Sequence, residues 1–213
     1  MCAVRSGNFR LERADGVRTE IERLTRWFST LDRALLECRA DDLPRRVVHH
    51  DCKINNVLFD VATGRALCVI DLDTTMQGNV LSDLGELLRT ASCRSPEDEV
   101  HLASMSLDLD LVRALARGYL TGAAGLLTVE ELRALPLAGL ALGLMNAIRF
   151  LTDYISGDVY FRIHRESHNL DRCRAQLRLV ELLYEHLTDM REIFEDAVQE
   201  LAVSHSHSRG RIR

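Results

Sequence analysis

The sequence predicts a mainly α-helical protein, α+β overall, with one small β-hairpin region lying between helices. Most of the chain repeats its apolar residues every three or four positions, as helices do when one face is buried. Only residues 46–70 contain short runs of Val, Leu and Ile separated by turn residues, which is typical of strands. The length of 213 residues is enough for one well-filled domain or two small ones.

The first elements are a helix and three short strands. Residues 17–38 have the period of an amphipathic helix, which ends at the sequence DDLP in residues 41–44. The expected strands are residues 46–50, 56–59 and 66–70. The last two strands form a hairpin, because Thr63 and Gly64 between them are a turn sequence. No strand is expected after Asp73.

Helices make up the rest of the chain. The expected helices are residues 82–91, 107–120, 128–154, either straight or kinked at Pro136, and 170–201. The first of these has Ser82 or Asp83 near its N-cap, and the third begins with a capping box at Thr128. The polar, basic residues 204–213 are expected to be a disordered tail, which leaves residues 1–203 as the folded domain.

Composition excludes several classes of protein. The net charge of -5 and the aromatic share of 5% argue against a nucleic-acid surface. Six cysteines without a C-x-x-C pair indicate reduced thiols and a cytoplasmic location, and residues 1–10 lack the apolar core of a secretory signal. The longest apolar stretch, residues 134–148, is broken by Pro136 and Asn146 and is shorter than the about 20 residues of a membrane span. A buried core helix and no membrane partner are therefore expected.

A constellation of polar residues explains why a small β region interrupts the helices. Residues 49–56 read HHDCKINN, which has the form H-x-D-x-x-x-x-N, and the acidic sequence DLD follows at residues 71–73 after the hairpin. Transfer of a phosphoryl group from a nucleotide requires a carboxylate that orients and deprotonates the attacking hydroxyl, and oxygen ligands that hold magnesium against the phosphates. Asp51 suits the first task. Asn56 and Asp71 suit the second, because the hairpin returns the chain beside Asn56.

Four neighbouring residues are supporting candidates. His49 is either a structural residue of the loop or a catalytic one, and Lys53 either contacts a phosphate or is solvated. Asp73 either forms hydrogen bonds within the site or approaches a metal ion. Asp83 is expected to cap the helix that starts near it.

The order of these motifs resembles that of protein kinases, where H-R-D-x-x-x-x-N is followed by D-F-G, although DLD stands here in place of D-F-G. It is more similar to the aminoglycoside phosphotransferase and choline kinase superfamily, in which I-D-x-[DE] follows and then a glycine and D-L-[AG]. The chain has Gly78 and, at residues 83–85, DLG. This resemblance implies a protein-kinase-like C-lobe, ATP as co-substrate and Mg²⁺ as cofactor. It also implies that Asp83 braces the catalytic loop through backbone N–H groups.

Within that superfamily, residues 49–73 resemble the N-acetylhexosamine 1-kinase branch, in which H-x-D-x-K-I-N-N-V-L-F-D and A-L-C-V-I-D-L-D-T recur. The similarity continues in residues 149–154, 157–161 and 168–172. It implies that Arg149 and Tyr160 belong to a sugar pocket. Without the resemblance, Arg149 would be interpreted as a helix-surface residue and Tyr160 as a core residue. Gln77 and Leu84 depart from the proline and phenylalanine that the branch tends to have.

The resemblance further implies a β-rich N-lobe, which covers the nucleotide and supplies a phosphate-binding lysine. The residues before Arg46 show neither five strands nor a glycine-rich loop. The chain is therefore expected to be the C-lobe alone, with the N-lobe absent. An apolar surface near Asp51 and Asp71 is then expected to be exposed, and a missing N-lobe or a second copy of the chain is the expected partner.

These features lead to one expected function and two alternatives. The expected function is the ATP-dependent phosphorylation of the anomeric hydroxyl of an N-acetylhexosamine, with the sugar and the nucleotide as small-molecule partners. The first alternative is a truncated, non-catalytic remnant or binding module. The second is a kinase for another small alcohol, such as an aminoglycoside, choline or homoserine. A strongly acidic pocket would favour a cationic acceptor, and Arg149 in the pocket argues against one.

Overall fold

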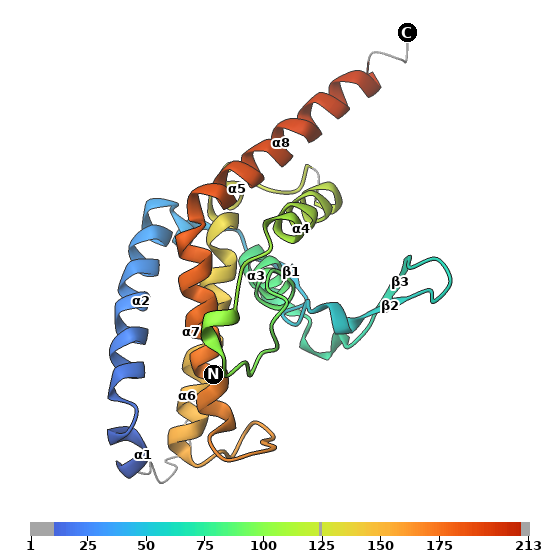
Figure 1. The fold of residues 1–213 in the computed structure, drawn as a ribbon. Helices are drawn as coiled ribbons and strands as arrows, with labels where there is room; N and C mark the ends of the chain where they lie inside the picture. The colour runs from blue at the N-terminus through green and yellow to red at the C-terminus, as the bar shows by residue number, and fades with distance from the viewer. Residues whose placement is uncertain (1–10, 124, 210–213) are drawn as a thin grey trace.

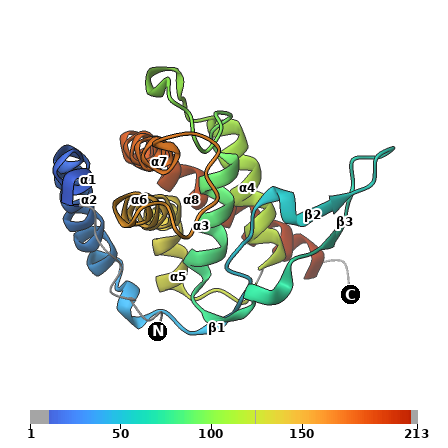
Figure 2. The ribbon, with the colours of Figure 1, turned by 90° about the horizontal axis from the view of Figure 1, so that it is seen from below.

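The computed structural model describes residues 11–123 and 125–209, and it is mainly helical with two short β ribbons, as the sequence predicts. The helices are α1 (Leu11–Asp15), α2 (Arg18–Glu37), α3 (Val80–Ala91), α4 (Leu109–Gly122), α5 (Val129–Ala134), α6 (Ala138–Ser156), α7 (His168–Glu185) and α8 (Leu187–Arg209). The strands are β1 (Arg46–Val48), β2 (Val57–Phe59), β3 (Ala66–Val69) and β4 (Met76–Gly78). Helices α2, α6 and α7 lie side by side, while the β2–β3 hairpin projects away from the helices (Figure 1 and Figure 2).

Helix α6 lies at the centre of the helical part, where it packs against α2, α3 and α7. Because it has neighbours on several sides, apolar side chains are buried around much of its circumference: Leu140, Leu144, Ala147, Phe150 and Leu151. The stretch Val129–Ser156 is long and apolar enough to cross a membrane, but 78% of its apolar window is buried inside the fold. The expected buried core helix is thus confirmed.

Helix α3 approaches α6 closely at Gly85. A Cβ atom at this position would lie 2.5 Å from the carbonyl oxygen of Ala138 and 2.6 Å from Leu142 Cδ2. Both distances are too short for a real Cβ atom, and the first is to backbone that cannot move aside in a close-packed interior. Glycine therefore sets the spacing of the two helices. This spacing places the first turn of α3 beside the loop that follows β1.

The two ribbons are antiparallel and separate from one another. In one, Val47 of β1 lies opposite Gln77 of β4, and in the other Leu58 of β2 lies opposite Cys68 of β3. The predicted hairpin is confirmed. Strand β4 contradicts the expectation of no strand after the hairpin, because three residues, one of them a glycine, are too few to show an alternating pattern.

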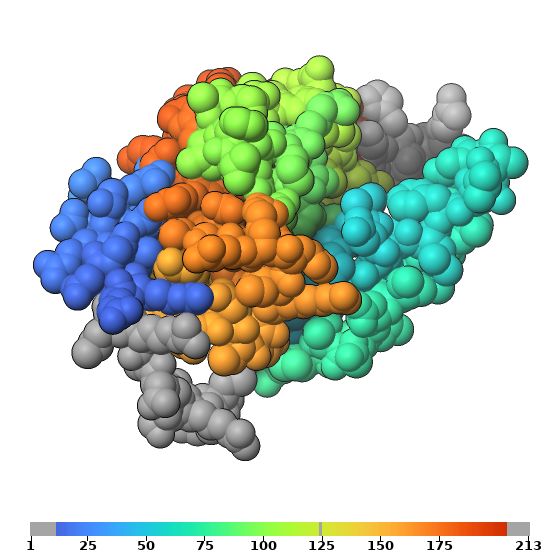
Figure 3. Space-filling view, turned by 60° about the horizontal axis from the view of Figure 1, so that its bottom comes forward, coloured from blue at the N-terminus to red at the C-terminus, as the bar shows by residue number. Residues whose placement is uncertain are grey.

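Apolar side chains of both ribbons and of the segments beside them are exposed, and we call them together the ribbon surface. Each of its members is at least 37% exposed: Val47, Ile54, Leu58, Phe59, Val61, Leu67, Val69, Ile70, Leu72 and Met76. Figure 3 shows the strands in cyan and teal at the side of the helical part. Ile70 and Leu72 flank Asp71, so the exposed apolar surface that the sequence predicts near the catalytic loop is present.

The helical region after residue 168 differs from the single helix expected over residues 170–201. Helices α7 and α8 are separated at His186, whose Nδ1 atom lies 2.8 Å from Asp189 Oδ2. The apolar period continues across the break, with Leu183 and Met190 both buried, so the pattern cannot reveal it. After the break, α8 packs against α4.

The expected disordered tail overlaps the end of helix α8. Helix α8 continues through Ser204 to Arg209. No glycine or proline occurs there before Gly210, and each added residue of an established helix gains a hydrogen bond. Residues 210–213 lie outside the described part of the chain.

Candidate active site

The loop after β1 is held in place by Asp83 in the first turn of α3. The Asp83 carboxylate accepts hydrogen bonds from the backbone N–H of His49 at 3.1 Å and of His50 at 2.8 Å. Asp83 is not the N-cap of α3, because the helix begins earlier than the sequence pattern indicates. Asn79 is the N-cap, and its side chain accepts a hydrogen bond from the Leu81 N–H at 3.1 Å. Asp83 is thus free to fix the loop.

His49 is buried, and both of its ring nitrogens are engaged. The Asp51 N–H donates to His49 Nδ1 at 3.3 Å, so the proton of the neutral ring is on Nε2, which donates to the Ile70 carbonyl at 3.1 Å. The His49 carbonyl accepts a hydrogen bond from Thr74 Oγ1 at 2.7 Å. This geometry supports the structural alternative for His49, since both ring nitrogens already have partners.

Asp51 presents an ionised carboxylate. Its Oδ2 atom accepts hydrogen bonds from Lys53 Nζ and from Asn56 Nδ2, both at 2.8 Å. Partial burial favours the neutral acid, but the bonds from Lys53 and Asn56 outweigh it, and the pKa of Asp51 is lowered below its ordinary value. Such a carboxylate can orient a hydroxyl group, and it takes the proton only once the hydroxyl has become acidic during the reaction. Lys53 is an ion-pair partner of Asp51, not simply a solvated residue.

The hairpin returns the chain to Asn56, as the motif spacing predicts. The Ile70 N–H donates to the Asn56 carbonyl at 2.9 Å, and Asp71 follows directly. Asn56 Nδ2 donates to both the carbonyl and the carboxylate of Asp51, so only the amide oxygen of Asn56 can act as an acceptor for a further partner. Asp71 itself has a positive φ of 64°, a conformation that aspartate tolerates better than most residues.

Negative charge is crowded at Asp71. A hydrogen bond with the Asp73 carboxyl group and repulsion by it, with smaller contributions from burial and from Asp51, raise the pKa of Asp71. A cation would relieve this repulsion. Carboxylate and amide oxygens are ligands that Mg²⁺ prefers, and Mg²⁺ takes only one or two carboxylates from a protein, so Asp71 and Asn56 fit this ion. Among the described residues, no three His, Cys, Asp or Glu side chains converge as a cluster that could hold a metal by themselves.

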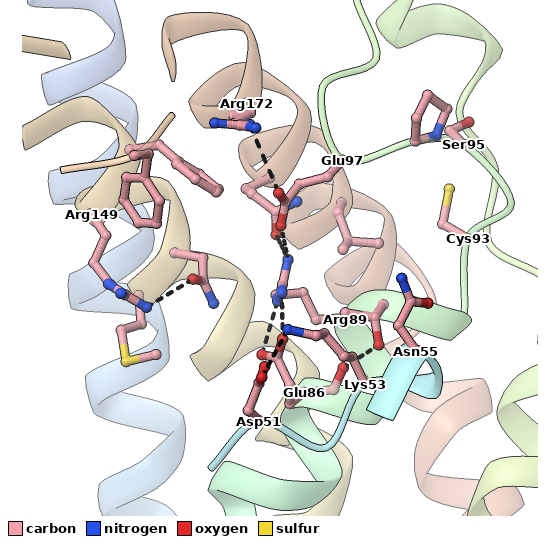
Figure 4. A pocket seen from close by; sticks show the side chains of 18 of the residues that line it. Asp51, Lys53, Asn55, Glu86, Arg89, Cys93, Ser95, Glu97, Arg149 and Arg172 are labelled. Atoms are coloured by element: carbon pink, nitrogen blue, oxygen red, sulfur yellow. Dashed lines mark hydrogen bonds and ion pairs between the residues drawn. The ribbon is translucent and has the colours of Figure 1, made fainter. Parts of the chain in front are cut away.

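A cavity of about 870 Å³ opens beside Asp51. Its wall combines the Asp51 loop with residues of α3, of the segment after α3, of α6 and of α7 (Figure 4). Asp51, Lys53 and Arg149 line the cavity, whereas Tyr160 and the two candidate metal ligands do not. The structure therefore brings the catalytic candidate and one of the two sugar-pocket candidates into one space.

Tyr160 is 74% exposed, which excludes the core alternative. It does not line the cavity, although its ring centre lies 5.8 Å from the guanidinium carbon of Arg149, which does, so its pocket role stays a prediction. Phe161 lines the cavity instead, with its ring centre 4.7 Å from that of Phe150 and 5.2 Å from the guanidinium carbon of Arg149. The physical reason is the buried Asp153 carboxylate, which accepts the N–H groups of residues 159, 160 and 161 at 3.0, 2.8 and 2.9 Å. These bonds fix the turn, and with it the direction of each side chain.

Several residues that shape the site have no motif of their own: Glu86, Arg89, Glu97, Asp153, Asn169 and Arg172. Asp153, Asn169 and Arg172 do lie in segments that resemble the N-acetylhexosamine 1-kinase branch, and Asp153 is a buried acid in an apolar helix, which is a usable signal. Arg89 and Glu97 give no such signal, because their partners are recognisable only in the folded chain.

A loop carboxylate beside a cavity, with a candidate amide ligand and a candidate carboxylate ligand at the two ends of the next hairpin, is the arrangement that phosphoryl transfer needs. A family model described as the phosphotransferase enzyme family matches residues 6–127. This match covers more than half of the 213 residues, and the chain belongs to that family. The match supports the resemblance to the aminoglycoside phosphotransferase and choline kinase superfamily, while the narrower branch stays a prediction. It ends before α5, so α6 and α7, which complete the cavity wall, lie beyond it.

Proposed function

We propose that this chain is the catalytic lobe of an ATP-dependent kinase that phosphorylates the anomeric hydroxyl of an N-acetylhexosamine, giving the sugar 1-phosphate. The observation on which the proposal depends is the cavity of about 870 Å³ whose wall contains the ionised Asp51 carboxylate. This volume lies within the range of small-molecule sites and accommodates a monosaccharide.

The charges of the cavity wall favour a neutral acceptor over a cationic one. Five cationic side chains and three carboxylates line the cavity: Lys53, Arg89, Arg149, Arg162 and Arg172, and Asp51, Glu86 and Glu97. A polycationic aminoglycoside or choline would therefore meet net repulsion. Arg149 forms a long hydrogen bond of 3.4 Å with Asn146, and its guanidinium has further N–H groups for an acceptor oxygen.

Each residue of the loop has a task in this proposal. Asp51 would accept a hydrogen bond from the acceptor hydroxyl and take its proton as the new O–P bond forms. Lys53 would supply positive charge next to the reacting oxygen. A magnesium ion held by Asn56 and Asp71 would neutralise charge on the phosphates of ATP. Asp71→Asn should then weaken magnesium and nucleotide binding, with partial rescue at high magnesium concentration.

The ribbon surface supports a partner that covers it. Large exposed apolar patches are uncommon on monomers, and the ribbon surface contains ten apolar side chains at one side of the helical part. A β-rich nucleotide-binding lobe is the partner that the proposed reaction needs, and a second copy of the chain is the other candidate. If no partner completes a nucleotide site, the chain would instead be a non-catalytic remnant or binding module.

An ADP-release assay tests the proposed function. The acceptors are N-acetylglucosamine and N-acetylgalactosamine, compared with an aminoglycoside, choline and homoserine. The assay is run with the chain alone and with the chain joined to a nucleotide-binding lobe. We expect turnover with the N-acetylhexosamines and not with the cationic acceptors. Turnover only with another acceptor would refute the substrate, and no turnover in either form would support the binding module.

A further inference from the structure

One column of charged side chains in the cavity wall has no part in the chemistry at Asp51. Arg89 pairs with Glu86 and, at 2.7 Å, with Glu97, and Arg172 Nε lies 3.8 Å from the second Glu97 oxygen. Figure 4 shows these side chains following one another away from Asp51 toward Arg172. The column combines α3, the segment after it and α7, which are brought together only by the fold.

Arg172 is the residue of this column that has an unsatisfied hydrogen-bond donor. Its Nη1 atom donates to Asn169 Oδ1 at 3.0 Å and to the Arg162 carbonyl at 3.3 Å, and its guanidinium carbon lies 5.4 Å from the ring centre of Phe150. Its Nε atom is buried, yet it has no hydrogen-bond partner within the described part of the chain. Buried donors are nearly always satisfied. The acceptor beside it, Glu97 Oε2, lies 3.8 Å away, beyond hydrogen-bond distance, so this N–H in the cavity wall can take a ligand oxygen.

Glu97 supplies the complementary group. Its side chain is 42% exposed and lines the cavity, while Arg89, only 8% exposed, holds one of its oxygens. A carboxylate accepts hydrogen bonds from hydroxyl groups, and a guanidinium donates to hydroxyl or carbonyl oxygens. Because positive and negative groups alternate along the column, an ion of either sign would meet repulsion from one of its neighbours there. A neutral group with several oxygens meets none.

We propose that Glu97 and Arg172 form a second contact for the acceptor, remote from its reacting hydroxyl, and that this contact binds an uncharged, hydroxyl-bearing part of the molecule. This inference rests on the proposed function, because the acceptor must enter the cavity beside Asp51. Arg172 Nε donates to an oxygen of the acceptor, and Glu97 accepts from one of its hydroxyls. Contacts at the remote end orient the reacting hydroxyl, so they contribute to turnover as well as to affinity.

A binding titration of the full chain with N-acetylglucosamine, followed by ligand-observed NMR, tests this contact. Glu97→Gln keeps the size of the side chain and removes its charge, while Arg172→Lys keeps the charge and removes Nε. Each should raise the Kd about 10- to 100-fold, the value of a hydrogen bond to a charged group. Arg178→Lys is the matched control, because Arg178 lies on the same helix, pairs with Glu185 at 3.0 Å and does not line the cavity. Its Kd should not change.

Monodeoxy analogues, one for each ring hydroxyl, identify the group that Glu97 contacts. When the hydroxyl that Glu97 contacts is absent from the sugar, Glu97→Gln should raise the Kd no further, since both changes remove the same hydrogen bond. Thermal unfolding of each variant separates a loss of binding from a loss of fold. Folded variants that bind the sugar as tightly as the wild type would overturn this inference and leave the proposed function standing. A wild-type chain that binds an aminoglycoside but no neutral sugar would overturn both.

Discussion

Helix α3 and the β2–β3 hairpin are close in sequence, and they are stabilised in different ways. Leu84 and Leu88 of α3 have no exposed surface, whereas every residue of β3 is exposed. The helix gains free energy from burial in the helical core, while an isolated two-stranded hairpin is marginal in water. Because Asp83 of α3 holds the loop that carries Asp51, the candidate catalytic carboxylate is positioned by the helical part, although its motif lies among the residues of the two ribbons.

The largest loss of stability is expected when the same substitution is made in α3 and not in the hairpin. Leu84→Ala leaves a cavity in the buried core around α3, and we expect it to lower the free energy of unfolding by about 2–5 kcal/mol. Leu67→Ala makes the same chemical change on β3, where the side chain is 65% exposed, and should stay within about 0.5 kcal/mol of the wild type. Urea denaturation measures both. Equal losses would mean that the hairpin is packed against the rest of the protein.

A smaller effect is expected at the contact between the two regions. Asp83→Asn keeps the shape of the side chain and removes the charge that accepts two backbone N–H groups, so we expect a loss of about 2 kcal/mol. Hydrogen exchange should be faster at the amides of His49 and His50. Asp110→Asn is the control, since Asp110 also lies in the first turn of a helix but is 95% exposed and pairs with Arg113 at 3.1 Å. Unchanged exchange in Asp83→Asn would show that another group holds the loop.

A second contact, between Arg46 of β1 and Glu131 of α5, also joins a ribbon to the helices. The pH dependence of stability tests it. The buried Glu131 carboxylate accepts hydrogen bonds from Arg46 of β1 at 2.6 and 2.7 Å and from the Thr128 N–H at 2.7 Å. Burial raises the pKa of Glu131, but these bonds outweigh it, and the pKa is lowered from its ordinary value of 4.5. The stabilisation is therefore present above about pH 4.5 and is lost as the pH falls through the lower pKa of the folded state.

Glu131→Gln should consequently be less stable than the wild type at pH 7, and its stability should fall less steeply in acid. Thermal unfolding between pH 7 and pH 3 follows both changes. Glu130→Gln, the neighbouring change on the same helix, should keep the acid dependence of the wild type. If the stability of Glu131→Gln and of the wild type fell equally steeply in acid, the Glu131 carboxylate would not be the group that stabilises this contact.

The smallest effect on stability is expected at the ribbon surface, together with a change of association. Val61→Ser with Leu67→Ser should leave the free energy of unfolding within about 0.5 kcal/mol, because both side chains are exposed. The proposed partner contact predicts that the chain self-associates and that this double variant does so less, as measured by sedimentation velocity. Leu126→Ser, 64% exposed and outside the ribbon surface, is the control. A wild-type chain that stays monomeric at all concentrations would argue against a second copy as the partner.

Local signals in the sequence predict local structure in this protein. The hairpin follows from Thr63 and Gly64 between two apolar runs, and the capping box at Thr128 is present, with the Glu131 side chain returning to the Thr128 N–H. The motif spacing also predicts that the chain returns to Asn56 before Asp71. Each of these features depends on residues less than about twenty positions apart, where short-range patterns carry the information.

Features that depend on one particular side-chain contact, and not on a repeating pattern or a turn sequence, could not be predicted. The direction of Tyr160 and Phe161 is decided by the carboxylate of Asp153, and the interruption at His186 is invisible to an apolar period that continues through it. The pairing of Arg89 with Glu97 likewise exists only in the folded chain. The cavity wall is therefore the part of the site for which the structure adds most.

The rate of ADP release at saturating ATP and N-acetylhexosamine, compared between the wild type and Asp51→Asn, tests whether Asp51 orients the acceptor and takes its proton. Asp60→Asn is the control, because Asp60 lies in the hairpin turn and holds the Thr63 N–H at 2.8 Å. We predict that Asp51→Asn lowers turnover by about 10²–10⁴-fold while the Kd of the sugar changes little, and that Asp60→Asn has no effect on turnover. Wild-type turnover in Asp51→Asn would contradict the role of this carboxylate.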